Sequence, residues 1–148
     1  MARLKPPPPL LASPDEIEQQ FYEALQQGDI DKLMAVWSDD DDIACVHPGG
    51  PRVVGATAIR ASFDVMFANS AIDAHPEKVR RVHGDGCAVH SVLERIQVMT
   101  PEGPQTGWVI ATNVYVKAAQ GWRLVVHHAS PGTAREVQEI VESSAVLH

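Results

Sequence analysis

The sequence predicts one α+β domain in which three helices precede an antiparallel sheet. Helical periodicity dominates the first half of the ordered chain, and four β-rich segments follow one another in the second half. Only short, turn-forming connections separate these segments, which is typical of antiparallel neighbours. Because helices and strands are segregated along the chain, the helices should gather on one face of the sheet.

Length and charge are typical of a single globular domain that does not bind nucleic acid. The chain has 148 residues and a formal net charge of −7, and its 12 lysines and arginines are scattered along it. Such a chain is poorly suited to bind phosphate backbones. Residues 1–11 lack the apolar run of a signal peptide or a membrane span, so we expect a cytoplasmic protein that does not contact membranes.

The first 12 residues predict a flexible arm, and residues 13–148 a single domain. Four consecutive prolines, Pro6 to Pro9, favour an extended polyproline II conformation. This arm could dock into an aromatic-lined groove of a partner or remain a solvated tail.

Capping signals and apolar spacing define the first two helices. Ser13 and Glu16 form a capping box, after which apolar residues recur at helical spacing until Gly28. A second helix, with an apolar face from Ile30 to Trp37, should end at the acidic run Asp39 to Asp42.

A short strand, a third helix and four longer strands complete the prediction. The strand covers residues 43–46 and leads into a turn rich in proline and glycine. The third helix, the four later strands and a short final helix are expected at residues 55–69, 74–82, 86–99, 106–117, 122–130 and 136–146.

Neither a metal nor a cofactor is expected. The run Asp39 to Asp42 lacks the alternating ligands and central glycine of an EF-hand loop. Cys45 and Cys87 lie in apolar, strand-like contexts without metal-ligand spacing, which favours two buried, reduced thiols.

Several local patterns occur in a fixed order between residues 14 and 131. They are Gly28-Asp29-Ile30 between the first helices, Trp37 before the acidic turn, Val46-His47-Pro48 followed by Gly55, and Gly121-Trp122 followed by His128-x-Ser130. With the order of elements, they resemble the SnoaL-like group of the nuclear transport factor 2-like superfamily. Within that group the chain is similar to the association (hub) domain of calcium/calmodulin-dependent protein kinase II. The resemblance implies a curved antiparallel sheet and three N-terminal helices around a cone-shaped pocket, as in the cystatin-like roll.

The residues that ketosteroid isomerase-like members use are not found at the matching positions. The tyrosine position falls on Phe21, the base carboxylate near His47, and the third position on Thr112 or Asn113. Chemistry of that type is therefore not expected. A cyclase or dehydratase could use histidine as its proton carrier, and His47 is the catalytic candidate.

His127 and His128 are further candidates in the last strand. Because side chains alternate along a strand, at most one of these neighbours can face the pocket. The other should face a partner subunit or bond within the packed interior.

The hub resemblance implies a pocket lined by three arginines, suited to carboxylate ligands. Here the three positions fall on Arg60, Glu94 and Asn113, so the charge would be compensated and the ligand more neutral. Arg60 and Glu94 are expected to share a hydrogen bond inside the cone. The alternative is that both are ordinary surface charges.

An apolar wall should complete the pocket, although aromatic residues at helical spacing are also typical of a core. Its members are Phe21, Leu25, Trp37, Phe63, Phe67, Trp108 and Tyr115. The function expected is binding of a small, largely apolar molecule, with isomerase, cyclase or dehydratase turnover left open. The alternative is a non-catalytic self-association module. In either case the apolar outer face of the sheet predicts a homodimer.

Overall fold

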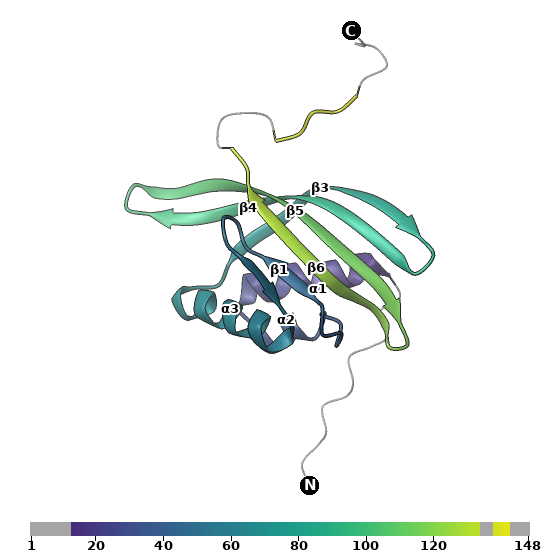
Figure 1. Ribbon diagram of the computed structural model, residues 1–148. Coiled ribbons are helices and arrows are strands. Elements are labelled where there is room, and N and C mark those ends of the chain that lie inside the picture. Colours follow the sequence, from purple (N-terminus) through teal and green to yellow (C-terminus); the bar gives the residue numbers. More distant parts are fainter. Residues whose placement is uncertain (1–12, 134–137, 143–148) are drawn as a thin grey trace.

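Three helices lie on one side of a curved, six-stranded sheet (Figure 1). The computed structural model describes residues 13–133 and 138–142. The elements are α1 (Pro14–Gln27), α2 (Ile30–Met34), β1 (Ala44–Val46), β2 (Arg52–Val54), α3 (Ala56–Asn69), β3 (Asp73–Gly84), β4 (Cys87–Thr100), β5 (Gly103–Ala118) and β6 (Gly121–Pro131). The predicted α+β class is confirmed.

The sheet is mixed rather than purely antiparallel. Its strand order is β2-β1-β6-β5-β4-β3, and β1 pairs with β6 in parallel while every other neighbouring pair is antiparallel. Short connections dictate the antiparallel order of β3 to β6, but they say nothing about where the earlier strand docks. The strand β2 was not predicted, because its three residues follow directly on the Pro-Gly-Gly-Pro turn.

The first helix begins and ends as its sequence indicates. The Ser13 hydroxyl accepts a hydrogen bond from the Glu16 amide at 3.3 Å. Gly28 ends the helix in the left-handed conformation, with φ of 65°. Because glycine has no Cβ, it adopts this conformation at the end of the helix without steric conflict.

The second helix is shorter than predicted because the chain after it pairs with β6. Helix α2 ends at Met34, three residues before Trp37. The Leu124 amide donates to the Val36 carbonyl at 2.8 Å, and the Ser38 amide donates to the Leu124 carbonyl at 2.9 Å. These bonds hold residues 36–38 against β6, where Trp37 forms an isolated parallel bridge with Leu124.

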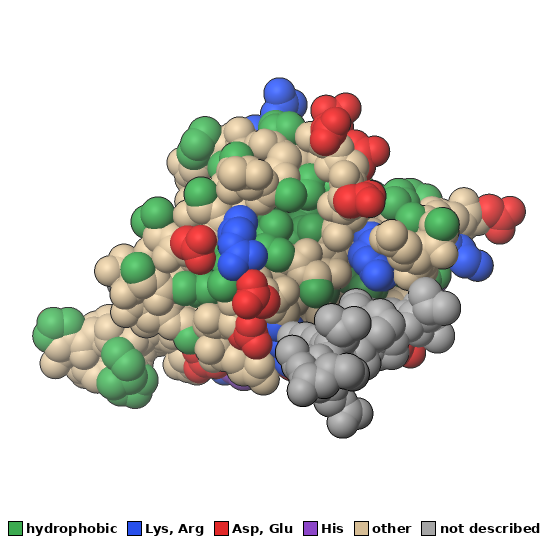
Figure 2. All heavy atoms as spheres, turned by 90° about the horizontal axis from the view of Figure 1, so that it is seen from below, with side chains coloured by type: hydrophobic (Ala, Val, Ile, Leu, Met, Phe, Trp, Pro, Cys, Tyr) green, Lys and Arg blue, Asp and Glu red, His purple; other side chains and the backbone are tan. Residues whose placement is uncertain are grey.

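The core fills the space between the helices and the concave face of the sheet. Phe21 and Leu33 are fully buried, and Phe63 is 2% exposed. On the outside, acidic and basic side chains are interspersed among apolar ones over the face seen in Figure 2. No helix within the described residues is long and apolar enough to cross a membrane.

Two other predictions, the final helix and the burial of both cysteines, do not agree with the described residues in full. Residues 138–142 are not helical, and the remainder of the predicted segment 136–146, like the N-terminal arm, lies outside the described residues. Both cysteines are free, but only Cys45 is buried, so the expectation that Cys87 is buried was wrong. Cys87 starts β4 immediately after a turn, where its side chain reaches solvent.

The conformation of Gly28 predicts a measurable cost for any side chain there. Gly28→Ala should lower the free energy of unfolding by about 1–2 kcal/mol, since the left-handed region is unfavourable for residues with a Cβ. Urea denaturation measures this. Gly84→Ala is the matched control, because Gly84 lacks a positive φ and a Cβ there would lie 3.9 Å from the nearest atom. Equal losses in both variants would contradict the prediction.

Candidate functional site

A cluster of ionisable and polar side chains lies inside the core, between α1 and the sheet. Glu18, His90, Glu94, Asn113 and His127 are each at most 5% exposed. Two tyrosines, Tyr22 and Tyr115, are equally buried beside them. No lysine or arginine among the described residues lies within ion-pair distance of the Glu18 or the Glu94 carboxylate. The carboxylates are therefore held by hydrogen bonds from uncharged donors and histidines.

Helix and strand periodicities bring these residues together. Glu18 and Tyr22 are four residues apart on α1, so both face the sheet. His90, Asn113 and His127 are cross-strand neighbours on β4, β5 and β6, so they form one row on the concave face.

The Glu18 carboxylate receives three hydrogen bonds on a single oxygen. Tyr115 Oη donates to Glu18 Oε2 at 2.7 Å, His90 Nδ1 at 3.0 Å and Asn113 Nδ2 at 3.2 Å. Three donors of this kind hold a carboxylate in one orientation inside the core.

Glu94 forms the second half of the cluster. Tyr22 Oη donates to Glu94 Oε2 at 2.7 Å and accepts from Asn113 Nδ2 at 3.1 Å. Burial raises the pKa of Glu94 to about 7, and the Tyr22 hydrogen bond opposes part of that rise. Near neutral pH this carboxyl can therefore gain or lose a proton.

Asn113 connects the two halves and fixes a neighbouring histidine. Its amide nitrogen donates to Glu18 and Tyr22, which leaves its oxygen to accept from His127 Nδ1 at 2.5 Å. Burial lowers the pKa of His127 to about 3, so its ring is neutral. Its other nitrogen lies 3.9 Å from Glu94 Oε2.

A further histidine, His83, extends the cluster from His90 to the surface. His83 is exposed, and its ring stacks on that of His90 with centroids 5.5 Å apart. Their Nε2 atoms are 3.3 Å apart. Because His90 Nδ1 faces Glu18, a continuous series of hydrogen-bonding groups leads from solvent to that carboxylate.

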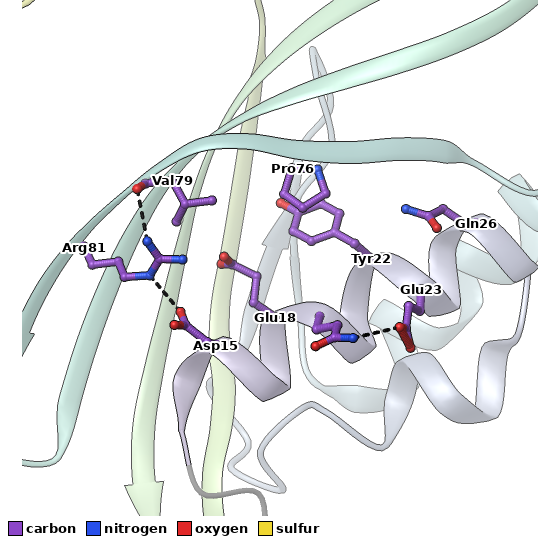
Figure 3. A pocket seen from close by; sticks show the side chains of 9 residues that line it. Asp15, Glu18, Tyr22, Glu23, Gln26, Pro76, Val79 and Arg81 are labelled. Atoms are coloured by element: carbon purple, nitrogen blue, oxygen red, sulfur yellow. Dashed lines mark hydrogen bonds and ion pairs between the residues drawn. The ribbon is translucent and has the colours of Figure 1, made fainter.

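A pocket of about 330 Å³ lies where α1 meets β3 (Figure 3). The Glu18 carboxylate and the Tyr22 ring point from α1 toward the space beneath β3. At one end, Arg81 Nε donates to Asp15 Oδ1 at 2.7 Å. The other lining residues are Gln19, Glu23, Gln26, Pro76 and Val79. The buried cluster therefore reaches a surface pocket through two of its members.

Arg60 does not join Glu94, and the expected hydrogen bond between them was wrong. Its guanidinium donates to Asp31 Oδ1 at 2.9 Å and its side chain is 46% exposed. Ile59 and Phe63 face the core, so the neighbouring position on the helix turns away from it. Arg60 lines a separate surface pocket of about 300 Å³, which also borders Trp37.

Glu94 and Asn113 do converge, as expected, although Tyr22 joins them in place of the arginine. His127 is the last-strand histidine that faces inward, and His128 is exposed on the outer face. Among the described residues, His47 makes no hydrogen bond to the cluster: its Nε2 lies 3.0 Å from Ser62 Oγ, and burial lowers its pKa.

The predicted aromatic wall is mostly packed core. Phe21, Trp37 and Phe63 are at most 5% exposed, and Phe67 packs against them while partly buried. Trp108 alternates with the buried Val109, which places it on the outer face instead. The family resemblance implied a cone-shaped pocket between the helices and the sheet. These rings and the polar cluster occupy that space.

Sequence reasoning missed Glu18, Tyr22 and His90 as site residues, and it treated Tyr115 only as wall. One signal was present: Glu18 and Tyr22 adjoin Ile17 and Phe21, which define the buried side of the helix. A carboxylate beside a buried stripe, four residues before a tyrosine, marks a polar strip that faces the sheet.

Comparison with known proteins assigns the chain to a family. The sequence profile of the SnoaL-like domain matches residues 15–134. The chain belongs to the SnoaL-like domain family. No curated protein matches it significantly.

Solved structures of other proteins share the fold of this chain. A protein of Thiobacillus denitrificans, provisionally named a calcium/calmodulin-dependent protein kinase type II association domain, is 32% identical over 85% of this chain and 100% of its own, with a TM-score of 0.77. A protein of Streptomyces avermitilis, provisionally named a nuclear transport factor 2-like dehydratase, is 28% identical over 81% of this chain and 94% of its own, with a TM-score of 0.73. The calcium/calmodulin-dependent protein kinase II hub of S. rosetta shares the fold at 23% identity, 82% and 99% coverage and a TM-score of 0.65.

The raised pKa of Glu94 predicts a stability that depends on pH. Between its ordinary value of 4.5 and about 7, the unfolded chain ionises while the folded protein stays protonated, so this group's contribution is lost as pH rises. Glu94→Gln removes this loss. The free energy of unfolding of Glu94→Gln minus that of the unmodified protein should therefore rise by about 3 kcal/mol between pH 4.5 and pH 8.

Urea denaturation at both pH values measures the difference between the two proteins, which removes the opposite contribution of His127. Glu102→Gln, in the exposed turn between β4 and β5, is the control and should show no such change. A Glu94→Gln difference that is constant with pH would refute the assignment.

Proposed function

We propose that this domain binds a small molecule in the pocket between α1 and β3 and that its buried polar cluster transfers a proton to or from that molecule. The observation that carries the proposal is that a cluster with two buried carboxylates opens onto a surface pocket through Glu18 and Tyr22. A ligand in this pocket would rest on both side chains.

The energetic cost of the cluster supports a functional role. Burying a carboxylate without a cationic partner is unfavourable, and apolar side chains of similar size usually stabilise a core at least as well. Groups with shifted pKa values gather at functional sites because catalysis requires them there. Glu18 and Glu94 are within one hydrogen-bonded cluster, joined through Asn113 and Tyr22.

The groups suit acid–base chemistry near neutral pH. A carboxyl with a pKa of about 7 can act as donor and acceptor at physiological pH, and Tyr22, which lines the pocket, donates to Glu94 through its Oη. The reaction class is the movement of a proton in an isomerisation, cyclisation or dehydration. The dehydratase name of the S. avermitilis relative agrees with this class.

Self-association is a second candidate function, favoured by the outer face of the sheet. Val89, Val114 and Val126 are cross-strand neighbours on β4, β5 and β6, and all three are only half-buried. Trp108 and Ile110 lie on the same face. An apolar face of this kind suits a two-fold interface, and the association-domain name of the T. denitrificans relative agrees with it.

The binding and proton-transfer proposal is tested with a fragment library and isotopically labelled protein. Bound compounds should shift the amide resonances of Gln19, Gln26 and Val79, which line the pocket. Compounds that bind should then exchange a C–H proton in D2O, and Tyr22→Phe should slow this exchange at least 100-fold, the scale of acid–base catalysis.

His128→Gln, on the opposite face of the sheet, serves as the control and should leave the exchange rate unchanged. Binding that maps to another surface, or exchange that Tyr22→Phe leaves intact, would overturn the proposal.

The self-association proposal is tested by light scattering after size exclusion. The chain mass is 16.1 kDa, so a homodimer should elute at twice that mass at micromolar concentration. Val114→Lys should give monomers, because it places a charge at the middle of the valine row. Val65→Lys is the control, since Val65 on α3 is 69% exposed. A monomeric mass for the unmodified protein would exclude the dimer.

A further inference from the structure

One oxygen of the buried Glu18 carboxylate has no partner from the described residues. All three hydrogen bonds to this side chain end on Oε2, from His90, Asn113 and Tyr115. Glu18 is only 4% exposed, yet Oε1 receives nothing from residues 13–133 or 138–142. An ionised carboxylate normally has all its buried acceptor sites filled.

Oε1 faces the pocket rather than the packed interior. Within the described residues, the one fully enclosed side-chain nitrogen or oxygen without a partner is Trp37 Nε1, so Oε1 keeps some access to the outside. Glu18 lines the α1–β3 pocket, and its carboxylate points into that space (Figure 3). The pocket therefore presents a fixed, unpaired acceptor at its floor.

The other charges of the pocket are already paired. Arg81 donates to Asp15 and to the Val79 carbonyl. Glu23 accepts from Lys32 at 3.3 Å and from Gln19 at 3.2 Å. Of the three carboxylates that line the pocket, Glu18 alone lacks a lysine or arginine partner among the described residues.

The remaining surface of the pocket accepts an apolar body. The Tyr22 ring, Pro76 and Val79 form part of its wall. The volume of about 330 Å³ is at the lower end of the range of small-molecule pockets, which favours a compact ligand.

We infer that the ligand of this pocket is a small amine, protonated at neutral pH, whose ammonium group donates a hydrogen bond to Glu18 Oε1 while an apolar body rests on Tyr22, Pro76 and Val79. This inference rests on the proposed binding function and names its ligand class. It reverses the charge preference that an arginine-lined pocket would have. A charge-assisted bond to a buried, oriented carboxylate is among the stronger polar contacts.

Three probes of matched shape separate the charge classes: benzylamine, benzyl alcohol and benzoate. Titration followed by amide resonances gives the affinity of each and the place where it binds. Benzylamine should bind in the α1–β3 pocket at least tenfold more tightly than benzyl alcohol, and benzoate should bind more weakly than either.

Substitutions at two carboxylates of the same pocket separate the specific contact from a general negative field. Glu18→Gln can still accept the three internal hydrogen bonds, but it presents a donor to the pocket and carries no charge. It should weaken benzylamine binding at least tenfold and leave benzyl alcohol binding within twofold. Glu23→Gln is the matched control, because Glu23 lines the pocket and is paired with Lys32, and its effect should stay under threefold.

Each outcome decides the inference. Benzyl alcohol or benzoate binding in the pocket as tightly as benzylamine would overturn the amine assignment and leave the binding function standing. Equal losses from Glu18→Gln and Glu23→Gln would also overturn it. If none of the three probes binds in the pocket at millimolar concentration, both the ligand class and the binding site are wrong. Should Glu18→Gln not fold, the affinity order of the probes on the unmodified protein decides the same question.

Discussion

The Asn113 side chain is the link on which the interior of this domain depends. Its amide nitrogen donates to Glu18 and Tyr22, and its oxygen accepts from His127. An amide can donate and accept at once, so it joins a helix to two strands without introducing a charge of its own. Removing one member of such a network strands the others, since each buried polar group needs its partner.

Local signals of the sequence defined most of the elements. The capping box at Ser13, the left-handed glycine at position 28 and the turns between the later strands each depend on nearby residues, so the sequence expresses them directly. The early end of α2 and the parallel docking of β1 depend on contacts with β6, about 80 residues later in the chain. Such contacts leave no local pattern, and both features were therefore mispredicted or missed.

In the candidate site, too, features that depend on nearby residues were predicted and features that depend on distant contacts were not. Alternation along β6 required His127 and His128 to face opposite sides, but the choice between them needed the register with Asn113 on β5. The arginine correspondence placed Glu94 and Asn113 correctly in the interior, yet Arg60 was misplaced because one residue along a helix changes the direction of a side chain by about 100°. Glu18 and Tyr22 went unrecognised because a polar residue on a helix ordinarily indicates the solvent side.

The separation of the site residues along the chain bears on how the protein folds. The hydrogen bonds from α1 to Glu94, His90, Asn113 and Tyr115 span between 72 and 97 residues. Contacts this distant form only after the intervening loops have closed, which makes folding slow compared with that of a helical domain of the same size. While the chain is being synthesised, the polar side of α1 stays exposed until the last strands emerge. Glu18 and Tyr22 both hydrogen-bond with water, so the side chains of α1 that are costly to bury later make this side of the helix compatible with solvent before the sheet has formed.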